Sequence, residues 1–249
     1  MRPRYVLLDV IGRGASGTVR AAWDRHRGSY VAAKAVSGVA PDPVRVDHPN
    51  VLATLDTGPA LVVTELVRGG SLRDLCADSG RLPESYVAVV LDQVLQALAA
   101  AHARGVVHRD VKPANLLLDA TGPGRPRVRL ADFGDATTIG TRGYLAPERE
   151  AGAPAHPSQD VYAAGVLAAR LLDRPGPLAT LASSMTRSEP ERRPTASEAL
   201  VRLRTLPVPR GGPWPEVPDR FDRLRSRSAD RAPRSDPWRR SAPPGSRRP

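Results

Sequence analysis

The sequence predicts an α+β protein of two lobes, a small antiparallel β lobe followed by a mainly helical lobe. Short strand-like segments separated by turns fill residues 1–66, whereas residues 67–206 hold long apolar segments with helical spacing. Strands that precede helices, rather than alternate with them, are typical of α+β folds. A chain of 249 residues is long enough for two small lobes that share a cleft.

The first lobe is expected to be built from short strands. They are residues 5–11, 18–24 and 30–36, followed by the segments TLDTG and LVVTEL. Apolar and β-branched residues dominate inside these segments and turn residues separate them, which is the usual pattern of strands. Because short connections join most of them, we expect an antiparallel meander, truncated in comparison with larger sheets.

The second lobe is expected to open with two helices. In GGSLRDLCADSG, Ser71 and Asp74 have the spacing of a capping box, and Gly80 ends the helix. Pro83 then suits the first turn of the strongest helix in the chain. Apolar residues keep helical spacing through it until Gly105.

Further helices are expected toward the end of the second lobe. Residues 158–172 form an apolar helix, and Thr195 with Glu198 forms a capping box at the start of another. The segment between Leu172 and Arg193 has room for about one helix of ordinary length.

Composition limits the class of protein. The single cysteine, Cys76, excludes an internal disulfide and fits a reducing cytosol. The N-terminus has no apolar signal core, and no apolar run reaches about 18 residues. We therefore expect a soluble cytoplasmic protein without a transmembrane segment. Of 37 basic residues only Lys34 and Lys112 are lysines, which indicates positions where a compact ammonium group is needed.

The last segment, residues 207–249, has the composition of a disordered tail. It is rich in proline, arginine and serine and carries much of the formal net charge of +11. So few apolar residues cannot offset the entropy of an ordered chain. The basic tail is expected either to be a solvated extension or to contact anionic surfaces. Aromatic residues are not interleaved with the arginines, so no specific nucleic-acid binding is expected.

The segment IGRGASGTV places Gly12, Gly14 and Gly17 between two predicted strands. Glycines let the backbone approach a phosphate closely and expose N–H groups to it. The same spacing occurs in tight hairpins and in dinucleotide-binding folds, but the latter need a helix after the glycines. Here TVRAAWD is strand-like, which leaves phosphate binding or a plain hairpin.

The segment HRDVKPANLLL is the strongest functional signal. Asp110 can accept a proton from an attacking hydroxyl group, and Lys112 can neutralise a phosphoryl group in transfer. Asn115 and Asp132, the latter in LADFG, offer oxygen ligands that suit Mg²⁺. Each of these residues alone is more simply an exposed loop residue. Together, at these spacings, they indicate phosphoryl transfer.

These motifs resemble the eukaryotic-type (Hanks-type) Ser/Thr protein kinases of bacteria. The resemblance covers about residues 5–205 and includes GRGASGTV, VAAK, HRDVKPAN, DFG and APE in order. It implies a two-lobed protein-kinase-like fold in which Asp110 is the catalytic base and Lys112 stands beside it. It also implies that Thr141 lies next to the base and that Lys34 contacts the nucleotide phosphates.

The resemblance also implies structural partners. Asp160, in DVYAAGV, matches a buried aspartate of the family, and Arg193 matches an arginine that pairs with Glu148. The activation segment is short, and Thr137 and Thr138 are the only hydroxyl residues in its first half.

An ATP site with Mg²⁺, or with Mn²⁺ in its place, follows from the same resemblance. Asn115 and Asp132 are the expected metal ligands. Thr64 is the expected gatekeeper, and the backbone from Glu65 to Val67 is expected to face adenine. The full set of expected nucleotide-site residues is Ile11, Gly12, Arg13, Gly14, Gly17, Val19, Ala32, Lys34, Thr64, Glu65, Val67, Asn115, Leu117 and Asp132.

The sequence departs from the family directly after VAAK. There the family has a helix whose glutamate pairs with the strand lysine, but residues 35–47 contain two prolines and no glutamate. Proline is excluded from helix interiors and biases the preceding residue toward extended structure, so we expect this helix to be missing. Asp42 and Asp47 are more simply solvated turn residues than partners of Lys34.

Two functions remain open at this point. The first is a Ser/Thr kinase that transfers the ATP γ-phosphoryl group to protein hydroxyls, with self-phosphorylation included. The second is a pseudokinase or nucleotide-binding scaffold with little or no phosphotransfer. A scaffold does not need Asp110, Asn115 and Asp132 together, which favours the enzyme. Lys112 and the segment GTRGYLAPE favour a protein substrate over a small molecule.

Overall fold

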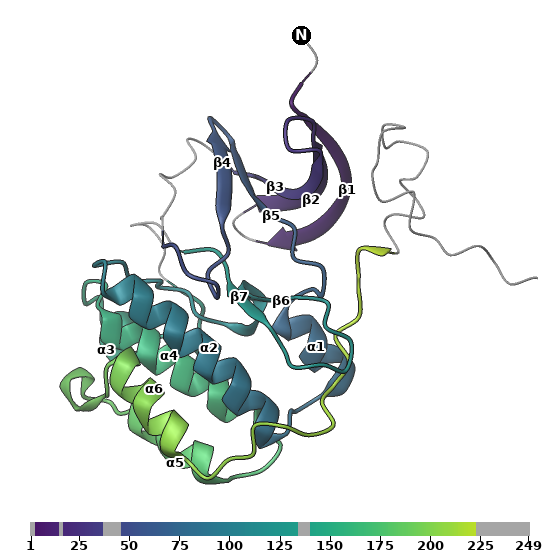
Figure 1. The fold of residues 1–249 in the computed structure, drawn as a ribbon. Helices are drawn as coiled ribbons and strands as arrows, with labels where there is room; N and C mark the ends of the chain where they lie inside the picture. The colour runs from purple at the N-terminus through teal and green to yellow at the C-terminus, as the bar shows by residue number, and fades with distance from the viewer. Residues whose placement is uncertain (1–2, 15–16, 37–45, 134–139, 223–249) are drawn as a thin grey trace, which may run out of the picture.

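The computed structural model describes residues 3–14, 17–36, 46–133 and 140–222. The chain forms a small β lobe, here the N-lobe, above a larger helical C-lobe (Figure 1). The α+β architecture predicted from the sequence is confirmed. The predicted absence of a helix over 37–45 lies outside the described residues.

The N-lobe is one antiparallel sheet whose strands lie in the order β1-β2-β3-β5-β4. The predicted meander is wrong at one place, because β5 rather than β4 pairs with β3. A tight hairpin joins β4 to β5, so β5 returns to the free edge of β3 and leaves β4 outermost. The strands are β1 (Tyr5–Gly14), β2 (Gly17–Asp24), β3 (Ser29–Ala35), β4 (Thr54–Gly58) and β5 (Leu61–Glu65).

The C-lobe packs its helices around α2, which is buried along most of its length. Both α4 and α6 pack against it (Figure 1). None of the helices in the described part of the chain is long and apolar enough to cross a membrane. The helices are α1 (Leu72–Ser79), α2 (Glu84–His102), α3 (Pro147–Glu150), α4 (Pro157–Leu171), α5 (Pro177–Met185) and α6 (Ala196–Thr205).

The predicted ends of α1 and the predicted start of α6 agree with the structure, whereas α2 begins after Pro83 and ends at His102 rather than at Gly105. Ser71 and Asp74 form the expected capping box at α1, and Gly80 caps its end with a φ of 72°. Thr195 and Glu198 form the second box at α6. Glycine is needed at the end of α1 because a positive φ is strained for residues with a side chain.

The segment that follows residues 37–45 is held by the C-lobe. Val46 and Val51 are buried in the large C-lobe core. The amide of Asn50 donates from Nδ2 to Gln93 Oε1 at 2.9 Å and to the Val128 carbonyl at 3.0 Å. Asp47 is exposed, as expected for a solvated turn residue. The chain therefore returns to the N-lobe sheet from a fixed point on the C-lobe.

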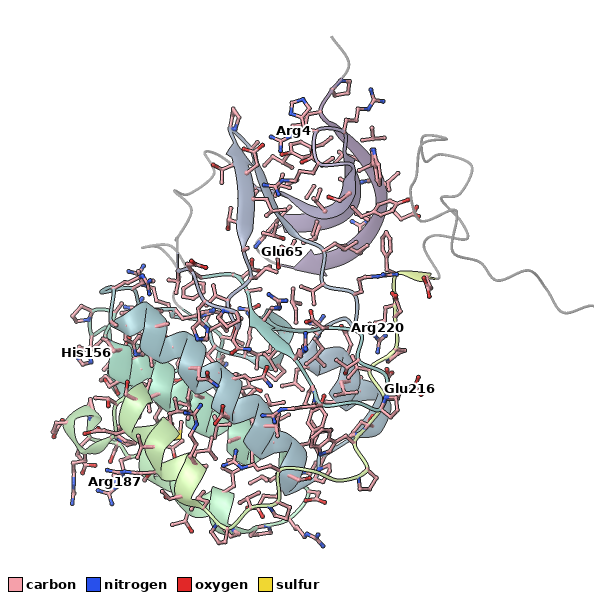
Figure 2. All side chains as sticks on the ribbon, in the orientation of Figure 1. Arg4, Glu65, His156, Arg187, Glu216 and Arg220 are labelled. Carbon is pink, nitrogen blue, oxygen red and sulfur yellow. The ribbon has the colours of Figure 1, made fainter. Side chains whose placement is uncertain are left out.

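Residues 207–222 form an extended segment, here called the C-terminal strap. It runs from α6 along the edge of the C-lobe to the side of the N-lobe (Figures 1 and 2). Val208, Val217 and Phe221 are buried, with 5, 1 and 6% of their surface exposed. The prediction that a disordered tail begins at residue 207 is therefore wrong for 207–222. A few apolar residues are enough to order this segment, because Val208 and Val217 pack into the C-lobe core and Phe221 packs against residues of the N-lobe. Residues 223–249 lie outside the described part.

The predicted pair of Arg193 and Glu148 is confirmed and ties α3 to the start of α6. Arg193 Nη1 and Nη2 donate to the two carboxylate oxygens of Glu148 at 2.7 and 2.8 Å. Arg193 Nε donates to the Arg187 carbonyl at 2.6 Å. Burial alone would raise the pKa of Glu148, but the bonds from Arg193 hold that pKa below its usual value.

Replacing Arg193 by alanine should lower the free energy of unfolding by about 3–5 kcal/mol, since it leaves a partly buried carboxylate without its partner. Arg192→Ala is the matched control, because the Arg192 side chain is 61% exposed. Its cost should stay within about 0.5 kcal/mol. Folding lowers the pKa of Glu148 below 4.5, so the stabilisation is complete at neutral pH and is lost in more acidic solution. Urea unfolding at pH 7 measures both variants, and equal losses would contradict the pairing.

Removing residues 207–249 should lower Tm by about 5 °C or more, because Val217 and Phe221 each bury apolar surface worth about 1.5–3 kcal/mol. The matched control removes residues 223–249 only and should leave Tm unchanged. Thermal unfolding followed by circular dichroism distinguishes them. Identical Tm values for the two truncations would show that the strap contributes nothing to stability.

Candidate active site

Three of the four residues predicted to carry catalysis, Asp110, Lys112 and Thr141, meet with Asn115 in one hydrogen-bonded cluster, whereas the fourth, Lys34, contacts Asp132. Thr141 Oγ1 donates to Asp110 Oδ1 at 2.7 Å, and Lys112 Nζ lies 2.6 Å from Asp110 Oδ2. Lys112 Nζ also donates to Thr141 Oγ1 at 2.7 Å. Asn115 Nδ2 donates to Asp110 Oδ2 at 3.1 Å and to its carbonyl at 2.8 Å. The Asp110 carboxylate is therefore fixed in orientation by donors on two sides.

A buried carboxylate holds the loop that carries this cluster. Asp160 on α4 is 1% exposed and accepts hydrogen bonds from the backbone N–H groups of His108 and Arg109 at 2.7 and 2.8 Å. His102 Nε2 lies 2.8 Å from the same carboxylate. The backbone of Arg109 takes a φ of 73°, which is uncommon for a residue with a side chain. Asp160 is thus buried, as the sequence predicted. Its two carboxylate oxygens accept the backbone N–H groups of this tight turn.

His108 is a structural part of the site that the sequence reasoning did not single out. It is fully buried, and its Nε2 lies 3.0 Å from the Ala131 carbonyl. Its ring packs on Phe133, with 4.5 Å between ring centroids. Burial lowers the pKa of His108, which keeps the ring neutral near pH 7. His108 therefore fixes the distance between the loop of Asp110 and the strand end that leads to Asp132.

Lys34 finds its partner in the other lobe. Lys34 Nζ donates to Asp132 Oδ1 at 2.7 Å, across the cleft between β3 and the end of β7 (Val128–Leu130). The Lys34 side chain is 16% exposed and that of Asp132 is 45% exposed. The lysine of the first lobe is thus held by a carboxylate from the DFG segment, 98 residues along the chain.

Asn115 and Asp132, the residues predicted to bind a metal ion, each carry an oxygen atom of the kind that magnesium takes. Asn115 directs its Nδ2 at Asp110, so its carbonyl oxygen is the atom left for a cation. The exposed carboxylate of Asp132 faces the same cleft. Within the described ranges, no group of three or more acidic, histidine or cysteine residues has an arrangement that could hold a metal ion. A pair of oxygen ligands suits Mg²⁺, which usually takes its remaining ligands from phosphate and water.

The expected roof of the nucleotide site lies on β1, β2 and β3. Gly12 pairs with Val19 and Gly14 with Gly17 in the hairpin that carries the glycines. Gly17 has a φ of 130°, and a Cβ there would lie 2.1 Å from the Ala35 carbonyl oxygen. Only glycine fits that position. Ile11 and Arg13 on β1 are exposed, and residues 15–16 lie outside the described ranges.

The other residues expected to bind adenine come from both lobes. Ala32 pairs with Thr64 across β3 and β5, and Thr64 Oγ1 donates to the Glu65 carbonyl at 3.2 Å. Val67 follows in the link to the C-lobe. Leu117, in β6 (Leu116–Leu118), is half-buried in the hairpin with β7. The structure thus places Thr64 on the N-lobe sheet and Leu117 on the hairpin of the C-lobe.

A pocket opens beside Asp110 on the side of the C-lobe. Its lining includes Arg109, Asp110, Thr141, Tyr144 and Arg149. Thr137 and Thr138, predicted as the hydroxyl residues of the activation segment, lie outside the described residues.

Comparison with protein families matches this architecture. The model described as the protein kinase domain matches residues 5–188. A solved structure of Rad53 residues 1–466 in complex with AMP-PNP aligns with a TM-score of 0.67 and 25% identity. The alignment covers 79% of this chain and 64% of that chain. The kinase-like fold predicted from the sequence is therefore confirmed.

Curated relatives are serine/threonine-protein kinases of actinobacteria. PkaA of Streptomyces coelicolor is 31% identical over 279 residues, covering 83% of this chain and 51% of PkaA. PknL of Mycobacterium tuberculosis is 40% identical over 144 residues, 51% of this chain and 35% of PknL. PknA of the same species is 34% identical over 199 residues, 66% of this chain and 45% of PknA. The chain spans about half or less of their length.

A family match over most of the chain, a kinase structure that superposes on both lobes and the order of the motifs agree with one another. The chain belongs to the protein kinase family, in its bacterial serine/threonine (Hanks-type) branch.

Proposed function

We propose that this protein transfers the γ-phosphoryl group of ATP to serine or threonine hydroxyls of proteins, its own included. The observation that carries the proposal is the cluster in which Lys112, Thr141 and Asn115 all contact the Asp110 carboxylate. A binding scaffold gains nothing from orienting this carboxylate. An enzyme that activates a hydroxyl group requires it.

Asp110 is the base in this proposal. The substrate hydroxyl donates its proton to the Asp110 carboxylate as its oxygen forms a bond to the γ-phosphorus, and the bond from that phosphorus to the β-γ bridging oxygen breaks. Thr141 and Asn115 hold the carboxylate in place, so the proton acceptor does not reorient during the step. The products are the phosphorylated protein and ADP.

Lys112 supplies positive charge where the transferred group passes. Its ammonium lies within hydrogen-bond distance of both Asp110 and Thr141. A compact ammonium can neutralise an equatorial phosphoryl oxygen without the bulk of a guanidinium group. This is consistent with lysine at position 112 in a chain whose other basic residues, apart from Lys34, are arginines.

Lys34 and Asp132 would position the phosphates of ATP. Asp132 and the carbonyl oxygen of Asn115 would hold Mg²⁺, which neutralises charge on the β- and γ-phosphates when bound. Lys34 already lies against Asp132 at 2.7 Å. Its ammonium is therefore directed at the place where the phosphates meet the cation. We infer that this contact orients Lys34 where the family uses a helix glutamate. Mn²⁺ is the alternative cation for the same oxygen ligands.

The adenine ring would lie between Ala32 and Val19 above and Leu117 below. The backbone from Glu65 to Val67 would face its edge, with Thr64 at the back. Val19, Ala32 and Leu117 lie within β2, β3 and β6, and Thr64 and Glu65 form the end of β5. The remaining residues of the roof, Ile11, Gly12, Arg13, Gly14 and Gly17, would cover the ribose and phosphates.

Asp110→Asn should reduce phosphotransfer by about 10²–10⁴-fold, because an amide cannot accept the substrate proton. Phosphate incorporation from labelled ATP with Mg²⁺, into the protein itself and into a generic acceptor protein, measures the loss. Asp173→Asn is the matched control, since Asp173 is exposed at the end of α4. Wild-type protein no more active than the Asp110 variant would refute the enzyme and leave a scaffold.

Lys34→Met should reduce kcat/KM for ATP by about 10²-fold, because a misplaced phosphate costs roughly that factor. Lys34→Arg should be nearly as impaired, since a planar guanidinium differs in shape from the ammonium that contacts Asp132. Steady-state kinetics with varied ATP check both. Full activity in Lys34→Met would mean that the phosphates are positioned without this lysine.

A further inference from the structure

The C-terminal strap is attached to the C-lobe at its first half. The Trp214 ring packs on Tyr86 of α2, with ring centroids 6.4 Å apart. Val217 forms backbone hydrogen bonds with Gly122 in both directions, at 3.0 and 2.8 Å, and its side chain is buried. These contacts fix the path of the strap before it reaches the link between the lobes.

The strap then crosses the segment that links the two lobes and contacts it at Arg68. The backbone N–H of Arg220 donates to the Arg68 carbonyl at 2.9 Å, and Arg68 Nη2 lies 2.5 Å from the Asp219 carboxylate. Arg220 also pairs with Asp78 at the end of α1. Figure 2 shows Arg220 beside α1, well below the N-lobe sheet.

Two glycines after the link make room for this crossing. A Cβ on Gly69 would lie 2.5 Å from Val217 Cγ1, and a Cβ on Gly70 would lie 2.7 Å from Arg220 Cδ. Side chains at these positions would collide with the strap. The link and the strap therefore fit each other closely.

The strap ends in the N-lobe with Phe221. Its ring packs with buried Leu8 and Ala21 and with the partly buried residues Val6, Tyr30 and Leu66. The ring centroids of Phe221 and Tyr30 are 5.0 Å apart with an edge-on orientation. Leu66 belongs to the segment proposed to face adenine. Phe221 thus joins β1 and β2 to the link between the lobes.

The sheet face that Phe221 covers is the face of the proposed nucleotide site. Residues paired across an antiparallel ladder point to the same face, as do alternate residues of one strand. Ala21 pairs with Ala32, and Ala32 pairs with Thr64. Tyr30, Ala32 and Lys34 alternate along β3. The ring of Phe221 therefore packs beside the roof of the nucleotide site, on the same face as Lys34.

We propose that the strap is a part of the nucleotide site and that Phe221 is a positioning residue for the nucleotide. Through the cluster that it forms with Leu8 and that Leu66 packs against, the ring sets the separation between the glycine-rich strands and the adenine-facing backbone. It acts through these two residues rather than by contact with the reacting atoms. The inference rests on the proposed kinase function and adds to it a residue outside the motifs of the family.

Phe221→Ala should raise the Kd for AMP-PNP with Mg²⁺ on the order of tenfold. The glycine-rich strands would lose the aromatic contact that sets their separation from the adenine-facing backbone. KM for ATP should rise by a similar factor, whereas kcat should change by no more than about twofold, since the Asp110 cluster is untouched. Phe221→Leu keeps an apolar side chain at the site and should restore most of the affinity. Isothermal titration and steady-state kinetics on the full chain measure these values.

Trp214→Ala is the matched control, because it removes a strap contact on the C-lobe alone. It should lower Tm and leave the nucleotide Kd within about twofold of wild type. Equal Kd values for wild type and Phe221→Ala would overturn the inference while leaving the proposed function in place. So would a Trp214→Ala loss of affinity equal to that of Phe221→Ala, since the strap would then act by stability alone. Wild-type protein without affinity for AMP-PNP would overturn both the inference and the function.

Discussion

The buried carboxylate of Asp160 is the constraint on which the arrangement of the site depends. It accepts the backbone N–H groups of His108 and Arg109 and contacts His102. Buried polar groups of this kind must be paired, so the turn at Arg109 and the carboxylate satisfy each other. Because the turn is fixed, Asp110 leaves it in a defined direction and meets Lys112, Asn115 and Thr141. A helix in the C-lobe core thereby determines the geometry of a surface loop.

The two lobes meet through contacts of different chemistry. At the inner end of the cleft, the ion pair of Lys34 and Asp132 joins β3 to the segment after β7. At the outer end, the strap joins α2 to the face of the N-lobe sheet through apolar contacts. The ion pair lies where the nucleotide phosphates are proposed to bind, and the apolar contacts of the strap lie apart from it. The lobes are therefore joined at two separate places.

The parts of the fold that sequence reasoning predicted well depend on local or motif-specific chemistry. The capping boxes at Ser71 and Thr195 rest on side chains three residues apart, which the sequence displays directly. The pairing of Arg193 with Glu148 and the burial of Asp160 came from the resemblance to kinases. The order of β4 and β5 was missed because both arrangements satisfy the same strand pattern. The strap was missed because composition averages over a segment, whereas three buried residues, Val208, Val217 and Phe221, are enough to order it.

The sequence alone determined the proposed phosphoryl-transfer residues Asp110, Lys112, Asn115 and Asp132, since two short motifs contain them at the expected spacing. It also showed that Lys34 lacks the glutamate that the family provides. Only the tertiary structure decided what Lys34 contacts instead, a carboxylate 98 residues away. Likewise, only the tertiary structure placed Phe221 against Leu8 and Leu66. Both outcomes depend on how separate lobes face each other, and that relation is set by packing over the whole chain rather than by any local pattern of residues.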